Sequence, residues 1–235
     1  MVIGMIKVAV FDLGGTLVQY PLYWQPLYRP SLEKAAQDCN MALTEEMFTL
    51  AYDILMKYNT RENPREYEVP SDIIFSEISS AWSCQADMEN IKAAFFSFFN
   101  AYALPFPESR EALLHLKQAG IQTGILSDVP YGMDNRFALQ SISTLSDLTD
   151  FFVSSVDAGY RKPHGEGYRM HLEHFAVLPN EMLYIGDEEK DIIGANRQGI
   201  ISVLINRSDA QKDFGQTYTI NSLSEIQQII NIAVQ

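Results

Sequence analysis

The sequence is short of positive charge. Its 235 residues include 17 lysines and arginines against 30 aspartates and glutamates, which gives a formal net charge of −13 at pH 7. So acidic a chain lacks the basic field that holds a polyphosphate backbone or an anionic bilayer at physiological salt. We therefore expect no nucleic-acid partner and no membrane partner. Nothing in the sequence indicates the oligomeric state.

Cysteines and long apolar runs are also scarce. Cys39 and Cys84 allow one disulfide at most, and we expect free thiols that fill apolar space. The first apolar stretch has no basic run before it and is interrupted by Lys7 and Asp12, so it does not fit a signal peptide. The apolar segment 93–106 is too short to span a bilayer. These observations predict a folded, cytoplasmic protein.

Short apolar runs that end in polar residues recur along the chain. Residues 5–11 form a nearly continuous apolar run, typical of a strand buried on both faces of a parallel sheet. The other expected strands are 122–126, 151–156, 182–185 and 201–205. Helical patterns lie at 108–119, 189–198 and 224–233. This alternation predicts a three-layer α/β fold with a doubly wound parallel sheet.

Residues 21–103 interrupt the alternation. They contain expected helices at roughly 31–39, 45–58, 71–82 and 88–102. The last helix has Phe95, Phe98, Phe99 and Tyr102 at helical spacing, which we interpret as a packing stripe. We therefore expect an α/β core domain of residues 1–20 and 104–235, with a helical domain of residues 21–103 inserted after the first strand.

Three polar residues follow the expected strands directly. Asp12, Ser127 and Asp187 each lie at the point where an apolar run ends. Taken singly, each fits an ordinary turn or helix cap. In an open parallel sheet, however, ligands bind at the carboxyl ends of the strands, where such residues converge. Together with the Lys162-Pro163 pair, they indicate one functional site.

Four motifs carry a resemblance to a known family. They are Asp12-Leu13-Gly14-Gly15-Thr16-Leu17, Ser127 after an apolar run, Arg161-Lys162-Pro163, and Gly186-Asp187-Glu188-Glu189-Lys190-Asp191. In these motifs and their spacing, the sequence resembles the haloacid dehalogenase-like (HAD) hydrolase superfamily from residue 5 to residue 199. The inserted helical domain resembles the helical cap of the first type in that family.

The resemblance implies a nucleophile, a lysine partner and metal ligands. It assigns Asp12 as the nucleophile that forms an aspartyl-phosphate, with Lys162 as its catalytic partner. We expect the charge of Lys162 to keep Asp12 ionised by lowering its pKa. Mg²⁺ suits hard oxygen ligands, which the resemblance places on Asp12, the backbone carbonyl of Gly14, Asp187 and Asp191.

The resemblance also implies donors for a phosphate group. Thr16, Ser127 and the backbone around Gly15 can bind anionic oxygens, because glycine lets the backbone approach closely. The implied function is Mg²⁺-dependent hydrolysis of a small phosphorylated metabolite.

Gly14 departs from the family pattern. Family phosphatases usually carry an aspartate there, which protonates the leaving oxygen and activates water. Loss of such a general acid costs about 10²- to 10⁴-fold in rate. A catalytically weakened phosphate-binding or regulatory protein is therefore an alternative, as is a phosphonatase-like or dehalogenase-like hydrolase. Phosphonatases use a cap lysine, for which Lys34 and Lys57 are available, but family dehalogenases usually carry tyrosine at the position of Gly14.

A kinase is a further alternative that the sequence disfavours. Asp-Leu-Gly-Gly-Thr is similar to the first phosphate loop of actin-like sugar kinases. Those proteins need a second, duplicated domain with another phosphate loop, and no such half is visible in this sequence. No strand is followed by a Walker A or GxGxxG sequence either.

Other polar residues carry weaker signals. His171 and His174 lie one turn apart on an expected helix, at a spacing that fits a metal site, but a solvated helix face is the simpler interpretation. Asp128, Tyr131 and Arg161 flank the motif residues, where they either shape the site or serve as ordinary loop residues.

Overall fold

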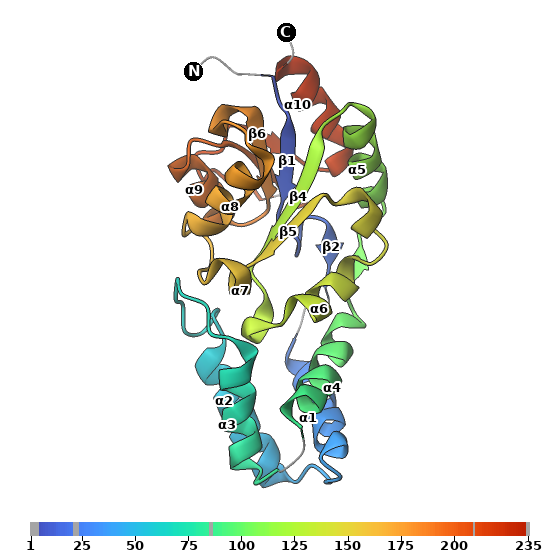
Figure 1. Ribbon diagram of the computed structural model, residues 1–235, viewed down its shortest axis with the longest axis vertical. Coiled ribbons are helices and arrows are strands. Elements are labelled where there is room, and N and C mark those ends of the chain that lie inside the picture. Colours follow the sequence, from blue (N-terminus) through green and yellow to red (C-terminus); the bar gives the residue numbers. More distant parts are fainter. Residues whose placement is uncertain (1–4, 21–23, 85–86, 209, 234–235) are drawn as a thin grey trace. The chain divides into compact units, whose positions relative to one another are not determined.

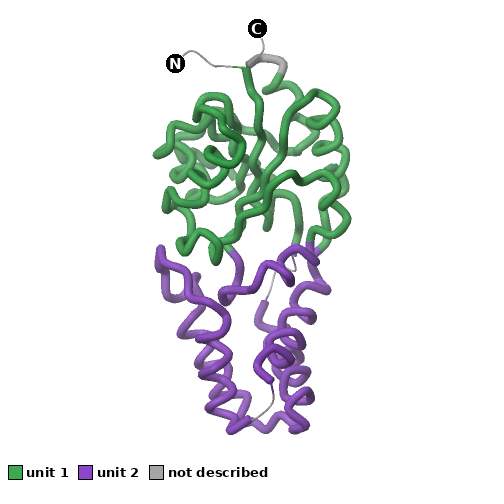
Figure 2. The backbone as a smooth tube through the Cα atoms, viewed as in Figure 1, with its two compact units in different colours: residues 1–19, 104–128, 142–235 green, residues 20–103, 129–141 purple. Residues whose placement is uncertain are grey.

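The computed structural model describes residues 5–20, 24–84, 87–208 and 210–233. The chain divides into two compact units, shown in different colours in Figure 2. The first, here called the α/β unit, contains residues 1–19, 104–128 and 142–235, and the second, the helical unit, contains residues 20–103 and 129–141. The helical unit thus includes residues 129–141 in addition to the inserted segment.

A parallel sheet forms the centre of the α/β unit. Among the described residues it has six strands in the order β5-β4-β1-β6-β7-β8 (Figure 1). The strands are β1 (Val8–Phe11), β4 (Gln122–Ser127), β5 (Phe151–Ser154), β6 (Met182–Gly186), β7 (Ile201–Ile205) and β8 (Tyr218–Ile220). β1 lies between β4 and β6, with Val8 opposite Gln122 on one side and Met182 on the other. The five expected strands are confirmed, and the short edge strand β8 is an addition.

Helices cover both faces of this sheet. The helices α5 (Ser109–Gln118) and α10 (Ile226–Ala233) lie on one side, and α8 (Glu166–Phe175) and α9 (Glu189–Arg197) lie on the other (Figure 1). On the side of α8 and α9, Val8 and Val10 share one buried apolar cluster with Tyr168 and Tyr184. The predicted three-layer α/β architecture is therefore confirmed.

Short elements complete the description. They are β2 (Val18–Gln19), which pairs antiparallel with β3 (Leu104–Pro105), α6 (Asn135–Ala138), α7 (Ser155–Ala158), and the 3₁₀ turns η1 (Pro130–Gly132), η2 (Leu139–Ile142), η3 (Ser146–Leu148), η4 (Pro179–Glu181) and η5 (Leu223–Glu225). Among the described residues, every helix falls short of the length and apolar character that crossing a bilayer requires.

Four longer helices form most of the helical unit, and they lie where the apolar spacing predicts them. They are α1 (Gln25–Asp38), α2 (Glu45–Tyr58), α3 (Ser71–Ala81) and α4 (Met88–Asn100). α1 packs on α4 and α2 packs on α3. α1 begins earlier than expected because Pro26 stands in its first turn, where proline needs no hydrogen-bonded N–H.

Aromatic side chains fill the interior of the helical unit. Phe95, Phe96 and Phe99 of α4 are almost completely buried. Phe137, from the later segment 129–141, packs against Phe96 with ring centroids 5.4 Å apart, which explains why that segment belongs to this unit. The expected packing stripe was wrong in one respect. Tyr102 is 42% exposed because it lies beyond the end of α4.

The expectation of free thiols was also wrong. Cys39 and Cys84 form a disulfide, with their Cα atoms 6.2 Å apart. Cys39 ends α1 and Cys84 follows α3, and the packing of the helical unit brings these two segments together. Sequence spacing does not show this proximity, because 45 positions separate the two cysteines.

Reduction of this disulfide is expected to destabilise the helical unit. Opening a loop closed over 45 positions costs about 4 kcal/mol of the free energy of unfolding in the chain-entropy account. Urea titrations with and without dithiothreitol measure the loss. The double variant Cys39→Ser/Cys84→Ser is the control, since its unfolding should not respond to the reductant. Equal midpoints for oxidised and reduced wild type would contradict the prediction.

His171 lies inside the α/β unit rather than on a solvated helix face. Its side chain is fully buried, and its Nδ1 lies 2.8 Å from the carbonyl oxygen of Gly167. The Nε2 atom has no hydrogen-bond partner among the described residues. Burial lowers the pKa of His171 to about 4. The solvated-face interpretation was therefore wrong for this residue, although His174 is exposed and stacks on Phe151.

We expect His171 to make the fold sensitive to mild acid. The unfolded chain protonates this imidazole near its ordinary pKa of 6.5, whereas the folded chain protonates it only near pH 4. Stability from this residue is therefore complete above pH 6.5 and falls by roughly 3 kcal/mol as the pH drops to 4. Urea unfolding of wild type and His171→Gln between these pH values measures the difference in slope. His174→Gln is the matched control, and an unchanged slope in His171→Gln would refute the assignment.

Candidate active site

The site lies at the carboxyl ends of three neighbouring strands of the α/β unit. Asp12 follows β1, Ser127 ends β4, and Asp187 follows β6. Because these strands are parallel and adjacent in the sheet, their ends meet at one edge. The backbone N–H of Asp12 donates to the carbonyl of Ile185 at 2.8 Å, which continues the pairing of β1 with β6 to the site itself.

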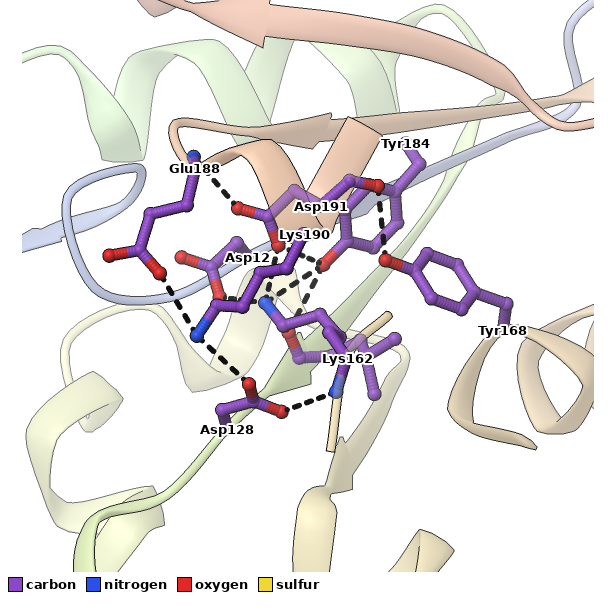
Figure 3. A network of polar contacts seen from close by, with 9 residues as sticks. Asp12, Asp128, Lys162, Tyr168, Tyr184, Glu188, Lys190 and Asp191 are labelled. Carbon is purple, nitrogen blue, oxygen red and sulfur yellow. Dashed lines mark hydrogen bonds and ion pairs between the residues drawn. The ribbon is translucent and has the colours of Figure 1, made fainter. Parts of the chain in front are cut away.

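The amine of Lys162 is the centre of this arrangement (Figure 3). It forms a buried ion pair with Oδ1 of Asp12 and lies 2.6 Å from Oδ1 of Asp191. It also donates to the hydroxyl of Tyr184 at 3.2 Å. Burial by itself would lower the pKa of Lys162, but the charges of Asp12 and Asp191 raise it well above its ordinary value. Lys162 is therefore a fixed cation in the site.

The charge state of Asp12 depends on two opposing effects. Burial raises the pKa of Asp12, and the positive charge of Lys162 lowers it. Burial is the larger effect, so the pKa of Asp12 lies well above its ordinary range. The ionising effect expected of Lys162 is present, but it does not overcome desolvation together with the neighbouring carboxylates of Asp191 and Asp187. An additional cation beside these groups would favour the ionised form.

A second ion pair holds the Lys162 loop. Oδ1 of Asp128 accepts from the backbone N–H of Lys162 at 3.0 Å, and Oδ2 accepts from the amine of Lys190 at 2.9 Å (Figure 3). Glu188 contacts the same amine at 2.9 Å. Burial opposes ionisation of Asp128, but the charges of Lys162 and Lys190 lower its pKa below the ordinary value. Asp128 therefore positions the backbone that carries Lys162.

Three carboxylates gather within reach of one ion. Asp12, Asp187 and Asp191 each offer an oxygen, and these atoms all lie within 4.8 Å of one another. Oδ1 of Asp187 is buried with no hydrogen-bond partner among the described residues. Asp191 is more constrained, since its Oδ2 accepts from the N–H of Glu188 at 3.0 Å. An orphaned carboxylate oxygen beside two other acids is the donor set that a hard divalent cation prefers.

The loop after Asp12 supplies neutral donors. Oγ1 of Thr16 is buried without a partner, and the N–H groups of Leu13, Gly14 and Thr16 donate to no acceptor in the described part of the chain. The N–H of Gly15, in contrast, already donates to the carbonyl of Val18 at 2.8 Å. Gly15 has a φ of +81°, and a side chain there would collide with the carboxylate of Asp187. Only glycine lets this loop approach the acidic cluster so closely.

Sequence reasoning missed several residues of the site. Tyr184 lies within the apolar run of β6, yet its hydroxyl reaches the centre, 3.3 Å from Oδ1 of Asp191. The hydroxyl of Tyr168 on α8 donates to the carbonyl of Asp191 at 3.1 Å. Lys190 lies in the fourth motif, but no role in the site was predicted for it. A polar group within a buried strand was the available signal for Tyr184. Tyr131, suspected of shaping the site, belongs to the helical unit, where its hydroxyl bonds that of Tyr28 at 2.6 Å.

The fold and the site together define a class of α/β proteins that carry carboxylates and a lysine at the carboxyl ends of the sheet strands. The haloacid dehalogenase-like hydrolase model matches residues 6–199, so the chain belongs to the haloacid dehalogenase-like hydrolase family. The resemblance found in the sequence motifs is thereby confirmed.

Individual relatives carry different activities. A glyceraldehyde 3-phosphate phosphatase of Methanocaldococcus jannaschii is 26% identical over 234 residues, covering 96% of this chain and 97% of the relative. A HAD phosphatase from Thermococcus onnurineus has a similar structure, with a TM-score of 0.66 at 20% identity and coverage of 96% and 98%. A 2-haloacid dehalogenase from Pseudomonas syringae has a TM-score of 0.68 at 19% identity and coverage of 97% and 99%. The two structural similarities bear on the fold only.

Replacing Lys162 by methionine is expected to destabilise the α/β unit. The change leaves Asp12 and Asp191 buried without their cation, and breaking a buried pair in this way costs about 3–5 kcal/mol. The loss should shrink as falling pH protonates Asp12, whose pKa is raised by burial. Urea unfolding at pH 8 and pH 5 measures it.

The matched control is Lys117→Met. Lys117 pairs with Asp150 at 3.0 Å, but both side chains are about one-third exposed, so its loss should cost less than about 1 kcal/mol. Similar losses for the two lysine variants would show that Lys162 does not hold the centre together.

Proposed function

We propose that this chain is a Mg²⁺-dependent phosphatase of a small phosphorylated metabolite, with Asp12 as its nucleophile. The observation that carries the proposal is the ion pair between Asp12 and Lys162 beside the orphaned oxygen of Asp187. A phosphate ester resists attack because its anionic oxygens repel a nucleophile. A site for its hydrolysis therefore needs both a positioned carboxylate and concentrated positive charge.

The proposed metal ligands are Asp12, the carbonyl of Gly14, Asp187 and Asp191, the last directly or through water. The carbonyl of Gly14 accepts no hydrogen bond from any described residue, which supports its inclusion. When bound, Mg²⁺ would offset the charge of the phosphoryl oxygens and favour the ionised form of the acids around it. When all three carboxylates are ionised, the single charge of Lys162 leaves this centre with a surplus of negative charge that attracts such a cation.

The chain's own residues carry the proposed chemistry. Asp12 attacks phosphorus, the bond to the leaving oxygen breaks, and an aspartyl-phosphate forms. Lys162 holds the carboxylate in place, while Thr16, Ser127 and the free N–H groups of the loop bind the phosphoryl oxygens. Water then attacks the aspartyl-phosphate, which releases inorganic phosphate and restores Asp12.

Relatives and chain order support the rest of the proposal. The similarity to a glyceraldehyde 3-phosphate phosphatase makes glyceraldehyde 3-phosphate the first substrate to test. The helical unit is inserted mainly after the Asp12 motif, and we propose that it acts as a cap that selects the substrate and excludes bulk water. A cytoplasmic location stays a prediction from the sequence.

Gly14 favours a second candidate function. Glycine has no side chain to protonate the leaving oxygen, and a missing general acid costs about 10²- to 10⁴-fold in rate. A protein that retains the metal and phosphate site without turnover would serve as a phosphate-binding or regulatory protein. The two candidates make different predictions for variants of Asp12 and Gly14.

Hydrolysis of glyceraldehyde 3-phosphate is expected to require Mg²⁺ and Asp12. Asp12→Asn should lower kcat/KM by more than about 10³-fold, because the amide is a poor nucleophile. Gly14→Asp should raise kcat by up to about 10²-fold, because it adds an acid for the alkoxide leaving group. Phosphate release with and without EDTA measures both effects.

Two variants control this experiment. Asp147→Asn changes an exposed aspartate of the α/β unit and should leave kcat/KM unchanged. Gly14→Asn adds a side chain of similar size without an acid and should not raise kcat. A silent wild type with an active Gly14→Asp variant would favour the regulatory candidate. Undiminished hydrolysis by Asp12→Asn would refute the phosphatase mechanism.

A further inference from the structure

Arg207 follows β7, outside the four family motifs, and contacts the loop after Asp12. Its Nε donates to the carbonyl of Gly15 at 3.2 Å, and its Nη2 donates to the carbonyl of Thr16 at 3.0 Å. One guanidinium group therefore binds two successive peptide groups of the loop. These two residues belong to the loop whose free N–H groups and orphaned Thr16 hydroxyl are the proposed phosphate donors.

These bonds fix the direction of two peptide groups of the loop, the one after Gly15 and the one after Thr16. In a trans peptide the C=O and the following N–H point in opposite directions. With the carbonyl of Gly15 held by Arg207, the N–H of Thr16 faces away from the guanidinium. The Cα of Gly15 lies against the carboxylate of Asp187, so the loop is confined between Arg207 and the acidic cluster.

Arg207 is itself held in place. Its Nη1 donates to Oε1 of Glu108 at 2.6 Å, and its guanidinium lies 3.6 Å from the ring centroid of Phe106. The backbone N–H of Phe106 donates to the carbonyl of Leu17 at 3.0 Å, so the same support reaches the end of the loop. An ion pair, a stacked ring and two loop carbonyls together leave the guanidinium little freedom to move.

We propose that Arg207 is a positioning residue for phosphate binding, which holds the loop of residues 13–17 so that its free N–H groups, those of Leu13, Gly14 and Thr16, stay directed toward the phosphoryl group. It acts through Gly15 and Thr16 and contacts no substrate. The inference rests on the proposed function, because it names the support of that same site. Preorganised donors bind an anion more tightly because the loop loses less freedom on binding.

The test measures binding of inorganic phosphate in the presence of Mg²⁺. The amide signals of residues 13–16 in the NMR spectrum of wild type should shift on titration. Arg207→Gln should raise the dissociation constant about 10-fold. Arg207→Lys should fall between, because the three donors of an ammonium group share one nitrogen and do not reproduce the planar fork that bonds both carbonyls and Glu108. Added guanidinium should restore much of the affinity of Arg207→Ala, an effect that general loss of stability does not produce.

Arg110→Gln is the matched control. Arg110 also bonds a carbonyl, that of Thr144, and a carboxylate, that of Asp147, but it does not contact the loop. The phosphate affinity of Arg110→Gln should match that of wild type. If Arg207→Gln does not fold, the phosphate affinity of Arg207→Lys is compared with that of wild type instead.

The outcomes separate this inference from the proposed function. Phosphate affinity in the Arg207 variants within two-fold of wild type, or a loss that guanidinium does not restore, would overturn the positioning role. So would a wild type whose amides 13–16 do not respond to phosphate. A wild type that hydrolyses no ester but binds phosphate through these amides, with an affinity that falls in Arg207→Gln, would refute the phosphatase and support the inference.

Discussion

The site depends on one buried ammonium group held between two carboxylates. Lys162 contacts Asp12 and Asp191, and all three side chains are largely removed from water. Such a cluster is stable only while every charge keeps its partner, because an unpaired buried charge is very costly. The surrounding contacts help to keep these charges paired. Asp128 fixes the backbone of Lys162, and Tyr184 adds a hydrogen bond to its amine.

The parallel sheet brings the residues of this cluster together. β1, β4 and β6 are neighbours with the same direction, so residues that follow them meet at one edge even though 175 positions separate Asp12 from Asp187. The site combines two kinds of group. Asp12, Asp187 and Asp191 supply carboxylate oxygens, and the loop after Asp12 supplies free backbone N–H groups. This combination suits a ligand that pairs a divalent cation with an anionic phosphoryl group.

Much of the fold was predictable because local patterns of apolar residues mark its strands and helices. Apolar runs marked five of the six described strands of the sheet, and apolar spacing marked the long helices of both units. The edge strand β8 was not predicted, because it has only three residues, one of them exposed, and therefore forms no apolar run. His171 was assigned to a solvated face because its imidazole is polar, although its spacing from Tyr168 and Phe175 places it on the buried side of α8. The disulfide was not predicted either, because the pairing of Cys39 with Cys84 depends on how α1 and α3 pack.

The sequence by itself determined the α/β class, the family motifs and the identity of the residues at the strand ends, because short-range order along the chain encodes strands, turns and their polar ends. Only the tertiary structure decided how those residues pair. It brought Tyr184 and Lys190 into the polar network and placed Arg207 behind the loop of Gly15 and Thr16. Such contacts join positions far apart in the chain. Their partners are chosen by packing and burial, which no local pattern records.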